Sequence, residues 1–254
     1  MGTDDGNRYI DPWPSMQPSW PAAPWIMTGT VLTAWFQLPR EVLEGLISPS
    51  LIPQTSEIGQ SRLRFYDVDF HSDDPDARQN PDGHFREAVI GLPAASGGET
   101  GEISAFMWSD SDTYMLWGRE VFGWPILRAA VDLNGELWAG NLASSAAGQS
   151  RVELADGSSA SITIDGIGNE LSQPTATAWF TPRLVPEPSS ASERRQLLVV
   201  RPTLIDPGRR HEVTGKTELM FREPHPLSGI HPRADRIEVS VGFVLRVGDR
   251  VDLL

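Results

Sequence analysis

The chain has 254 residues, no cysteine and a net charge of −13 at pH 7, from 21 basic and 34 acidic residues. This charge argues against nucleic acids and anionic membranes as partners, because phosphate binding needs clustered Lys and Arg. Without cysteine there are no disulfides, thiolate metal ligands or cysteine nucleophiles. No run approaches the ~20 apolar residues of a membrane helix, and the first residues lack the pattern of a signal peptide, so we expect a cytoplasmic protein.

The N-terminal segment, residues 1–27, is rich in Pro and Trp. Proline removes backbone donors and breaks helices, so we expect an extended arm whose indoles pack on the body. Residues 28–254 are expected to form a single domain. Within it, residues 29–38 predict a strand, and the segment after Pro39 predicts a short helix.

Residues 61–70 predict a further strand in which the apolar alternation slips at Val68, as it does at a β-bulge. Residues 109–125 predict the second helix. Ser109 to Asp112 can cap its start, and Gly123 and Pro125 end it. The residues that can share one face of this helix are Tyr114, Leu116, Trp117 and Val121.

Two dipeptides, Asn134-Gly135 and Asp156-Gly157, each predict the turn of a hairpin. About ten strands and two short helices, with no internal repeat, predict a mainly β (α+β) single domain that forms an antiparallel cone-shaped β-barrel or double sheet. Gly-rich nucleotide-binding motifs and the nucleophile elbow of hydrolases are absent. His71 and His84 flank an acidic loop without the spacing of a known metal site, so we expect no metal there.

The most informative stretch is Gly118-Arg119-Glu120-Val121-Phe122-Gly123-Trp124-Pro125. This signature resembles that of the acetoacetate decarboxylase-like family, in which a GRE helix precedes an aromatic residue and a proline. The resemblance extends over nearly the whole chain, through residues 33–48, 61–70, 84–92, 214–230 and 236–254. It implies a cone-shaped β-barrel with an internal pocket.

In decarboxylating members of that family, two lysines follow the proline, and one of them forms a Schiff base with the substrate. Here the corresponding residues are Ile126 and Leu127, and the one lysine of the sequence, Lys216, is distant from them. Aliphatic side chains supply no amine, so the resemblance implies a member that lacks the Schiff-base lysine and does not decarboxylate acetoacetate.

We predict Glu87 and Tyr66 as catalytic residues, because the resemblance aligns them with the two acidic residues of the family. In an apolar barrel Glu87 would be desolvated, which raises its pKa and leaves a neutral acid that can donate a proton. A pair with Arg86 or Arg119 would instead make Glu87 a structural ion pair. The predicted substrate-binding residues are Met107, Trp117, Phe122, Trp124 and Ile126.

Three functions remain open. The first is a non-decarboxylating cyclase similar to the polyketide cyclases of the family, which act in natural-product (antibiotic) biosynthesis. It would promote a cycloaddition or a ring-ether closure by confining an apolar substrate of more than about ten heavy atoms. The second is a lyase or dehydratase that uses Glu87, and the third is a pseudoenzyme that binds a hydrophobic ligand. We expect an apolar small-molecule substrate, no cofactor and a homo-oligomer.

Overall fold

The computed structural model describes residues 24–48, 51, 60–73, 83–172, 178–186, 193–247 and 251–253. Strands dominate this part of the chain. The helical elements are α1 (Arg40–Leu46), α2 (Asp112–Trp117), the π-helical turn η2 (Gly118–Phe122) and the 3-10 turn η3 (Glu136–Ala139). The strands are β1 (Trp25–Phe36), β2 (Ser61–Ser72), β3 (Gly83–Ser96), β4 (Glu99–Ser109), β5 (Ile126–Arg128), β6 (Ala130–Gly135), β7 (Gly148–Glu153), β8 (Ser159–Glu170), β9 (Ala178–Pro186), β10 (Glu193–Val200), β11 (Thr203–Asp206), β12 (Arg209–Met220), β13 (Ala234–Val247) and β14 (Val251–Leu253).

The described strands form one large sheet in the order β14-β10-β9-β4-β3-β2-β1-β13-β12-β8-β7-β6, with β11 on β13 and β5 on β4. The predicted mainly β fold is thereby confirmed, with two corrections. The sheet is mixed, because β4 pairs in parallel with both β9 and β5. Over the described residues its order also ends at β14 and at β6 rather than closing into a complete barrel.

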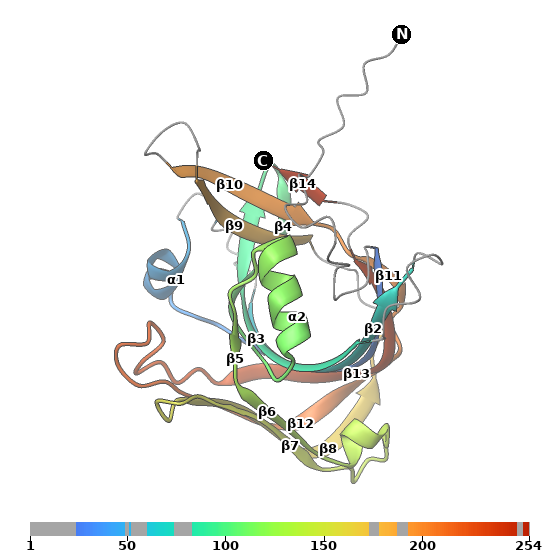
Figure 1. Ribbon diagram of the computed structural model, residues 1–254. Coiled ribbons are helices and arrows are strands. Elements are labelled where there is room, and N and C mark those ends of the chain that lie inside the picture. The colour runs from blue at the N-terminus through green and yellow to red at the C-terminus, as the bar shows by residue number, and fades with distance from the viewer. Residues whose placement is uncertain are drawn as a thin grey trace.

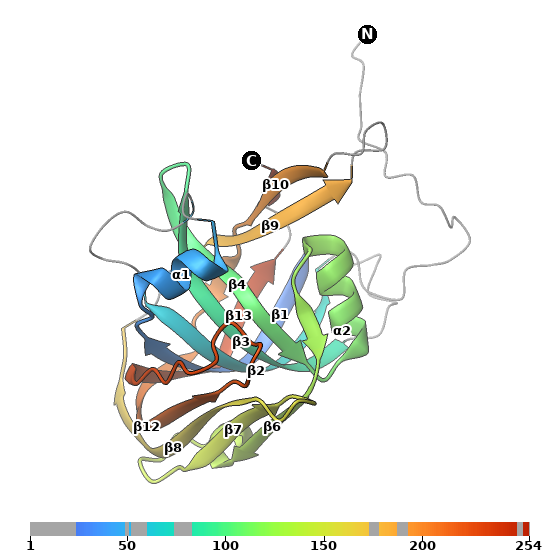
Figure 2. The same cartoon turned by 90° about the vertical axis from the view of Figure 1, so that its left-hand side faces the viewer.

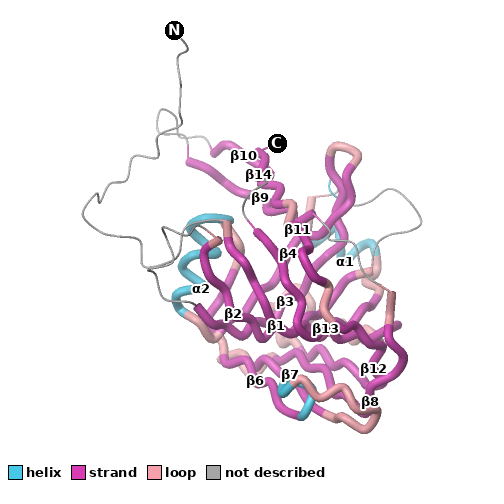
Figure 3. Tube along the Cα trace, turned by 90° about the vertical axis from the view of Figure 1, so that its right-hand side faces the viewer, coloured by secondary structure: helices cyan, strands magenta, loops and turns pink. Residues whose placement is uncertain are grey.

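The sheet folds over itself into two layers (Figures 1 and 2). Strands β1 to β4 and β13 curve around α2, and β12, β8, β7 and β6 form a second layer against the outer side of this curve. Figure 3 shows the same two layers from the side opposite to that of Figure 2, with β9, β10 and β14 at one end. One apolar cluster fills the space between the layers, and a second lies on the concave side with Tyr114 of α2.

Strand β2 is buried on both faces, and this corrects the predicted bulge at Val68. The registers of β2 with β1 and with β3 run without a shift. Leu63 and Phe65 pack in the cluster between the layers, whereas Val68 and Phe70 pack in the concave cluster. Successive side chains of a strand point to opposite faces. A strand whose apolar residues lie first on one face and then on the other therefore has the sequence pattern of a bulged strand without any shift in register.

The start of β1 corrects the boundary of the expected arm. The strand begins at Trp25, so residues 25–27 belong to the sheet, and the Trp25 indole packs edge-on against Phe122 with ring centroids 5.4 Å apart. Residues 1–23 lie outside the described residues. Among the described residues, no helix has the length and apolar content needed to cross a bilayer.

Of the two predicted hairpin turns, one is confirmed. Asp156-Gly157 joins β7 to β8, with Gly157 at a φ of +80° that favours glycine. Asn134-Gly135 does not form a two-residue turn, because β6 continues through it into η3 and only then returns as β7. The helix over 109–125 is shorter than predicted, since α2 passes into the π-helical turn at Gly118.

Candidate active site

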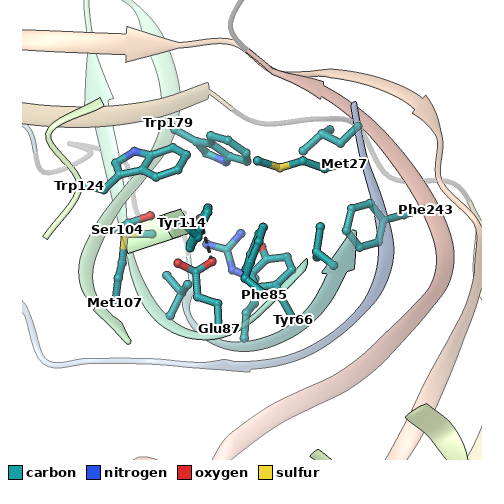
Figure 4. A pocket seen from close by; sticks show the side chains of 14 residues that line it. Met27, Tyr66, Phe85, Glu87, Ser104, Met107, Tyr114, Trp124, Trp179 and Phe243 are labelled. Carbon is teal, nitrogen blue, oxygen red and sulfur yellow. Dashed lines mark hydrogen bonds between the residues drawn. The ribbon is translucent and has the colours of Figure 1, made fainter. Parts of the chain in front are cut away.

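A small cavity of about 50 Å³ lies on the concave side of the sheet. Strands β1, β2, β3, β4, β9 and β13 contribute to its wall together with α2. Figure 4 shows Glu87 and Tyr66 on one side of the cavity and the indoles of Trp124 and Trp179 on the other. Apart from a few polar groups the lining is apolar, which is typical of a small-molecule site.

Glu87 is the buried carboxyl of this cavity, with 4% of its surface exposed. In β3 it is in phase with Phe85 and Val89, which pack in the concave cluster, so the alternation of the strand directs it inward. Its Oε2 accepts a hydrogen bond from the Tyr114 hydroxyl at 3.2 Å. Its Oε1 has no hydrogen-bond partner in the part of the chain that the structure describes.

Burial raises the pKa of Glu87 from 4.5 to about 8, although the hydrogen bond from Tyr114 and the charge of Arg64 both lower it. The carboxyl is therefore mostly neutral at pH 7. A protonated Oε1 can then donate to an acceptor in the cavity while Oε2 accepts from Tyr114. The alternative of an ion pair between Glu87 and Arg86 or Arg119 is not seen among the described residues, where Arg86 faces Asp67 at 3.7 Å and Arg119 is exposed.

Tyr114 reaches the cavity from α2. Ser111 is the N-cap of this helix: its hydroxyl accepts from the Tyr114 backbone N–H at 3.3 Å, and this cap fixes the first turn. The phenol ring is stacked on Phe85 with ring centroids 3.6 Å apart. Burial, together with the neighbouring Glu87, raises the pKa of Tyr114 well above its usual value, so the hydroxyl stays a donor.

Tyr66 lies directly opposite Glu87 in the register of β2 with β3. Its ring meets Phe243 edge-on at 6.4 Å, and the guanidinium carbon of Arg64 lies 5.7 Å from the ring centre. Burial raises the pKa of Tyr66, and the charge of Arg64 opposes the rise. Both Tyr66 and Arg64 line the cavity.

The structure places four of the seven predicted site residues at the cavity. Glu87, Tyr66, Met107 and Trp124 line it. Phe122 and Ile126 do not, because they are buried within the concave apolar cluster. The side chain of Trp117 lies outside the described residues.

Sequence reasoning missed several lining residues, of which Arg64, Tyr114, Trp179 and Phe243 matter most. The N-cap at Ser111 could have drawn attention to Tyr114, which is the first large side chain after it. Trp179 and Phe243 come from β9 and β13, and no local pattern brings these strands to β2 and β3.

Lys216 lies far from this chemistry. It is on β12 in the second layer, its side chain is 64% exposed, and its Nζ pairs with Glu218 at 3.2 Å. Directly after the signature of residues 118–125, Ile126 is buried beside Met107 in the sheet, and Leu127 is exposed. An amine therefore does not reach the cavity from the lysine of this sequence.

Metal-binding groups do not gather in the described residues, where no cluster of three or more His, Cys, Asp or Glu side chains could hold an ion. His84 contacts Asp67 at 3.1 Å and Asp69 at 2.9 Å, in an exposed position on β2 and β3. Most of the acidic loop between His71 and His84, residues 74–82, lies outside the described residues.

A larger cavity of about 460 Å³ adjoins the first. The two share five lining residues, which are Arg64, Tyr66, Trp179, Phe243 and Leu245. The larger cavity matches the size of sites for drug-sized ligands, whereas the smaller one has room for only a few atoms.

Fold and site together define a mainly β protein with a largely apolar cavity that contains the buried carboxyl of Glu87. The chain belongs to the acetoacetate decarboxylase (ADC) family, whose model matches residues 10–234. A search of curated proteins gives no match.

Solved structures of that family share the fold. The enduracididine biosynthesis enzyme MppR with HEPES buffer bound aligns with a TM-score of 0.72 and 16% identity, over 93% of this chain and 89% of that one. An acetoacetate decarboxylase-like enzyme from Sphingomonas wittichii RW1 gives 0.71 and 16%, over 97% and 98%. The acetoacetate decarboxylase from Legionella pneumophila gives 0.70 and 15%, over 98% and 94%. At these identities the likeness concerns the fold.

Proposed function

We propose that this member of the family is an enzyme that works without a Schiff-base lysine. It holds a carbonyl-containing, polyketide-type natural-product intermediate and promotes its cyclisation with Glu87 as the general acid. The observation that carries the proposal is the buried carboxyl of Glu87 in a largely apolar cavity, with no hydrogen-bond partner for its Oε1 among the described residues; burial also raises the pKa of this carboxyl to about 8.

The chemistry needs one proton and no cofactor. Glu87 Oε1–H donates to the carbonyl oxygen of the substrate, which makes the carbonyl carbon, or the conjugated carbon beyond it, more electrophilic. A hydroxyl of the same molecule adds to the conjugated carbon and closes a ring ether, which leaves the carbonyl end as an enol that tautomerises to the ketone. The hydroxyl proton is released as the new C–O bond forms, and it returns to Glu87. Tyr114 holds the carboxyl through Oε2, so that Oε1 is presented to the substrate.

Confinement supports the ring closure. The small cavity accommodates the reacting group, and the rest of a flexible substrate extends into the adjoining larger cavity. Holding both reacting ends in one geometry removes much of the entropy cost of cyclisation. An apolar substrate of more than about ten heavy atoms is compatible with the two cavities together.

A second candidate function is a lyase or dehydratase. MppR has been solved in complex with the condensation product of pyruvate and imidazole 4-carboxaldehyde, so a related fold accommodates a molecule made by joining two carbonyl compounds. Here Glu87 would protonate a departing hydroxyl, and its carboxylate would take up the proton of the carbon–hydrogen bond that breaks next to the carbonyl. Water and the conjugated carbonyl compound are then the products.

The test compares wild type with Glu87→Gln and with the exposed-carboxyl control Glu153→Gln, using linear polyketide-type hydroxy-enones as substrates. We expect a ring product whose rate falls by roughly 10²-fold or more in Glu87→Gln and is unchanged in Glu153→Gln. An unsaturated product lighter by one water would favour the dehydratase. Binding without any conversion across the substrates would contradict both enzymatic proposals and indicate a carrier or sensor.

A further inference from the structure

The larger cavity has an unusual concentration of positive charge. Four arginines line it. They come from strands β2, β12 and β13. They are Arg62, Arg64, Arg210 and Arg236. Apolar and aromatic side chains, among them Trp35 and Trp179, make up much of the remaining wall. In a chain with a net charge of −13, such a cluster is not explained by overall composition.

Two carboxylates offset only part of this charge. Glu102 pairs with Arg64 and lies 3.5 Å from Arg62. Glu238 pairs with Arg210 and lies 2.7 Å from Arg236. Each buried carboxylate thus faces two guanidinium groups, and within the described residues the cluster keeps an excess of positive charge. Such an excess is costly where a guanidinium group is shielded from water, as at Arg64 and Arg210, unless an anion offsets it.

Arg62 and Arg64 also retain unused donors. The Nε atoms of Arg62 and Arg64 are buried and have no hydrogen-bond partner within the described residues. The Arg64 side chain is only 10% exposed. Burial and then the charge of Arg64 lower the pKa of Arg62 to about 9, which is the direction expected for like charges held close together.

An indole holds two of these side chains in place. The guanidinium carbons of Arg62 and Arg236 lie 4.0 Å and 4.7 Å from the centre of a Trp35 ring. Stacking of this kind orients the planar guanidinium groups before a ligand arrives, and a guanidinium so oriented suits the two oxygens of a carboxylate. The larger cavity with its four arginines, which we call the arginine cavity, is therefore a preorganised polar site beside the smaller apolar cavity.

We propose that the arginine cavity binds a carboxylate on the apolar chain of the substrate, remote from the carbonyl group that Glu87 protonates. Glu87 lines only the small cavity, whereas Arg62, Arg210 and Arg236 line only the large one. A ligand that occupies both cavities therefore places its anionic end and its reacting carbonyl apart. This inference rests on the proposed function for the reacting carbonyl, and the ligand class it names is a long-chain oxo acid.

The anion site can be tested without turnover. Decanoate carries the carboxylate and the apolar chain but no reacting carbonyl, methyl decanoate is its neutral counterpart, and decyl phosphate is the competing oxyanion. Binding is measured by calorimetry and by tryptophan fluorescence, because Trp35 and Trp179 line the cavity. We expect decanoate to bind at least tenfold more tightly than methyl decanoate, and at least as tightly as decyl phosphate.

Variants then identify the residues. Arg62→Gln and Arg236→Gln are each expected to weaken decanoate binding roughly tenfold or more, and Arg62→Lys by less, while the exposed control Arg128→Gln binds as wild type. Melting temperatures verify that each variant is folded, and Arg62→Lys provides the reading if Arg62→Gln does not fold. Equal binding of acid and ester, or unchanged binding by these variants, would overturn the proposal in favour of a structural network. Tighter binding of decyl phosphate would overturn the carboxylate assignment.

The two proposals fail separately. Glu87→Gln is expected to bind decanoate within about twofold of wild type, because Glu87 does not line the arginine cavity. Decanoate binding without turnover of any substrate would overturn the proposed function and leave the anion site standing. If wild type does not bind decanoate and Arg62→Gln turns over neutral substrates at the wild-type rate, the anion site is overturned and the proposed function stands.

Discussion

The Tyr114 hydroxyl lies 3.2 Å from Glu87 Oε2, and this contact joins α2 to the middle of β3. A buried carboxyl costs least when it is neutral and hydrogen-bonded, and this pair achieves both. Because the phenol ring is also stacked on Phe85, the donor is fixed in direction. One hydrogen bond and one ring stack thus hold Tyr114 of α2 against Glu87 and Phe85 of β3.

The raised pKa of Glu87 predicts a specific dependence of stability on pH. Between the ordinary pKa of 4.5 and the folded value of about 8, the folded state binds more protons than the unfolded state. The free energy of unfolding therefore decreases as pH rises through this window, by on the order of a few kcal/mol. Glu87→Gln stays neutral, so its stability relative to wild type should increase from about pH 5 to about pH 9. Denaturant titrations measure this, and a constant difference would contradict the raised pKa.

Removal of the phenol hydroxyl should raise the pKa of Glu87 further, because the hydrogen bond from Tyr114 lowers it. Tyr114→Phe keeps the ring that stacks on Phe85, and we expect a loss of stability of about 1 kcal/mol. Carbon NMR of the Glu87 carboxyl measures the titration directly. The control Tyr66→Phe removes a phenol from the facing strand but leaves the donor from Tyr114 in place. A pKa that moves down in Tyr114→Phe would show that the hydroxyl does not stabilise the carboxylate form.

The fold could be predicted from sequence to a greater extent than the site. Strand composition and the family resemblance gave the mainly β class and the position of Glu87. The resemblance also placed Tyr66 at the site but not Arg64, because β2 is buried on both faces and its pattern resembles a bulge. Sequence reasoning assigned Ile126 to the lining, although it packs in the apolar cluster beside the cavity. Contacts from β9 and β13 depend on the pairing of strands distant in sequence, which periodicity does not encode.

Gly91 is expected to tolerate no side chain, because a Cβ there would overlap the carboxyl group of Glu102. Glu102 is buried and paired with Arg64, so its displacement leaves charges without compensation. We expect Gly91→Ala to destabilise the fold by roughly 2–4 kcal/mol. Gly45→Ala is the matched control in α1, where a Cβ meets no atom, and it should gain about 0.5–1 kcal/mol. Similar melting temperatures for the two variants would refute the role of Gly91.

The position of Lys216 predicts that acetoacetate cannot be trapped in the cavity. Reduction with borohydride captures an imine only where an amine meets the carbonyl, and the Nζ of Lys216 is exposed and paired with Glu218 in the second layer. Intact mass spectra should therefore show no stoichiometric adduct in wild type. Lys216→Arg removes the amine but keeps a cation beside Glu218, so it should turn over the substrate of the enzyme as wild type does. The contrary outcome is a stoichiometric adduct in wild type, with both the adduct and the turnover lost in Lys216→Arg. It would mean that this lysine reaches the substrate and that covalent chemistry replaces the acid catalysis of Glu87.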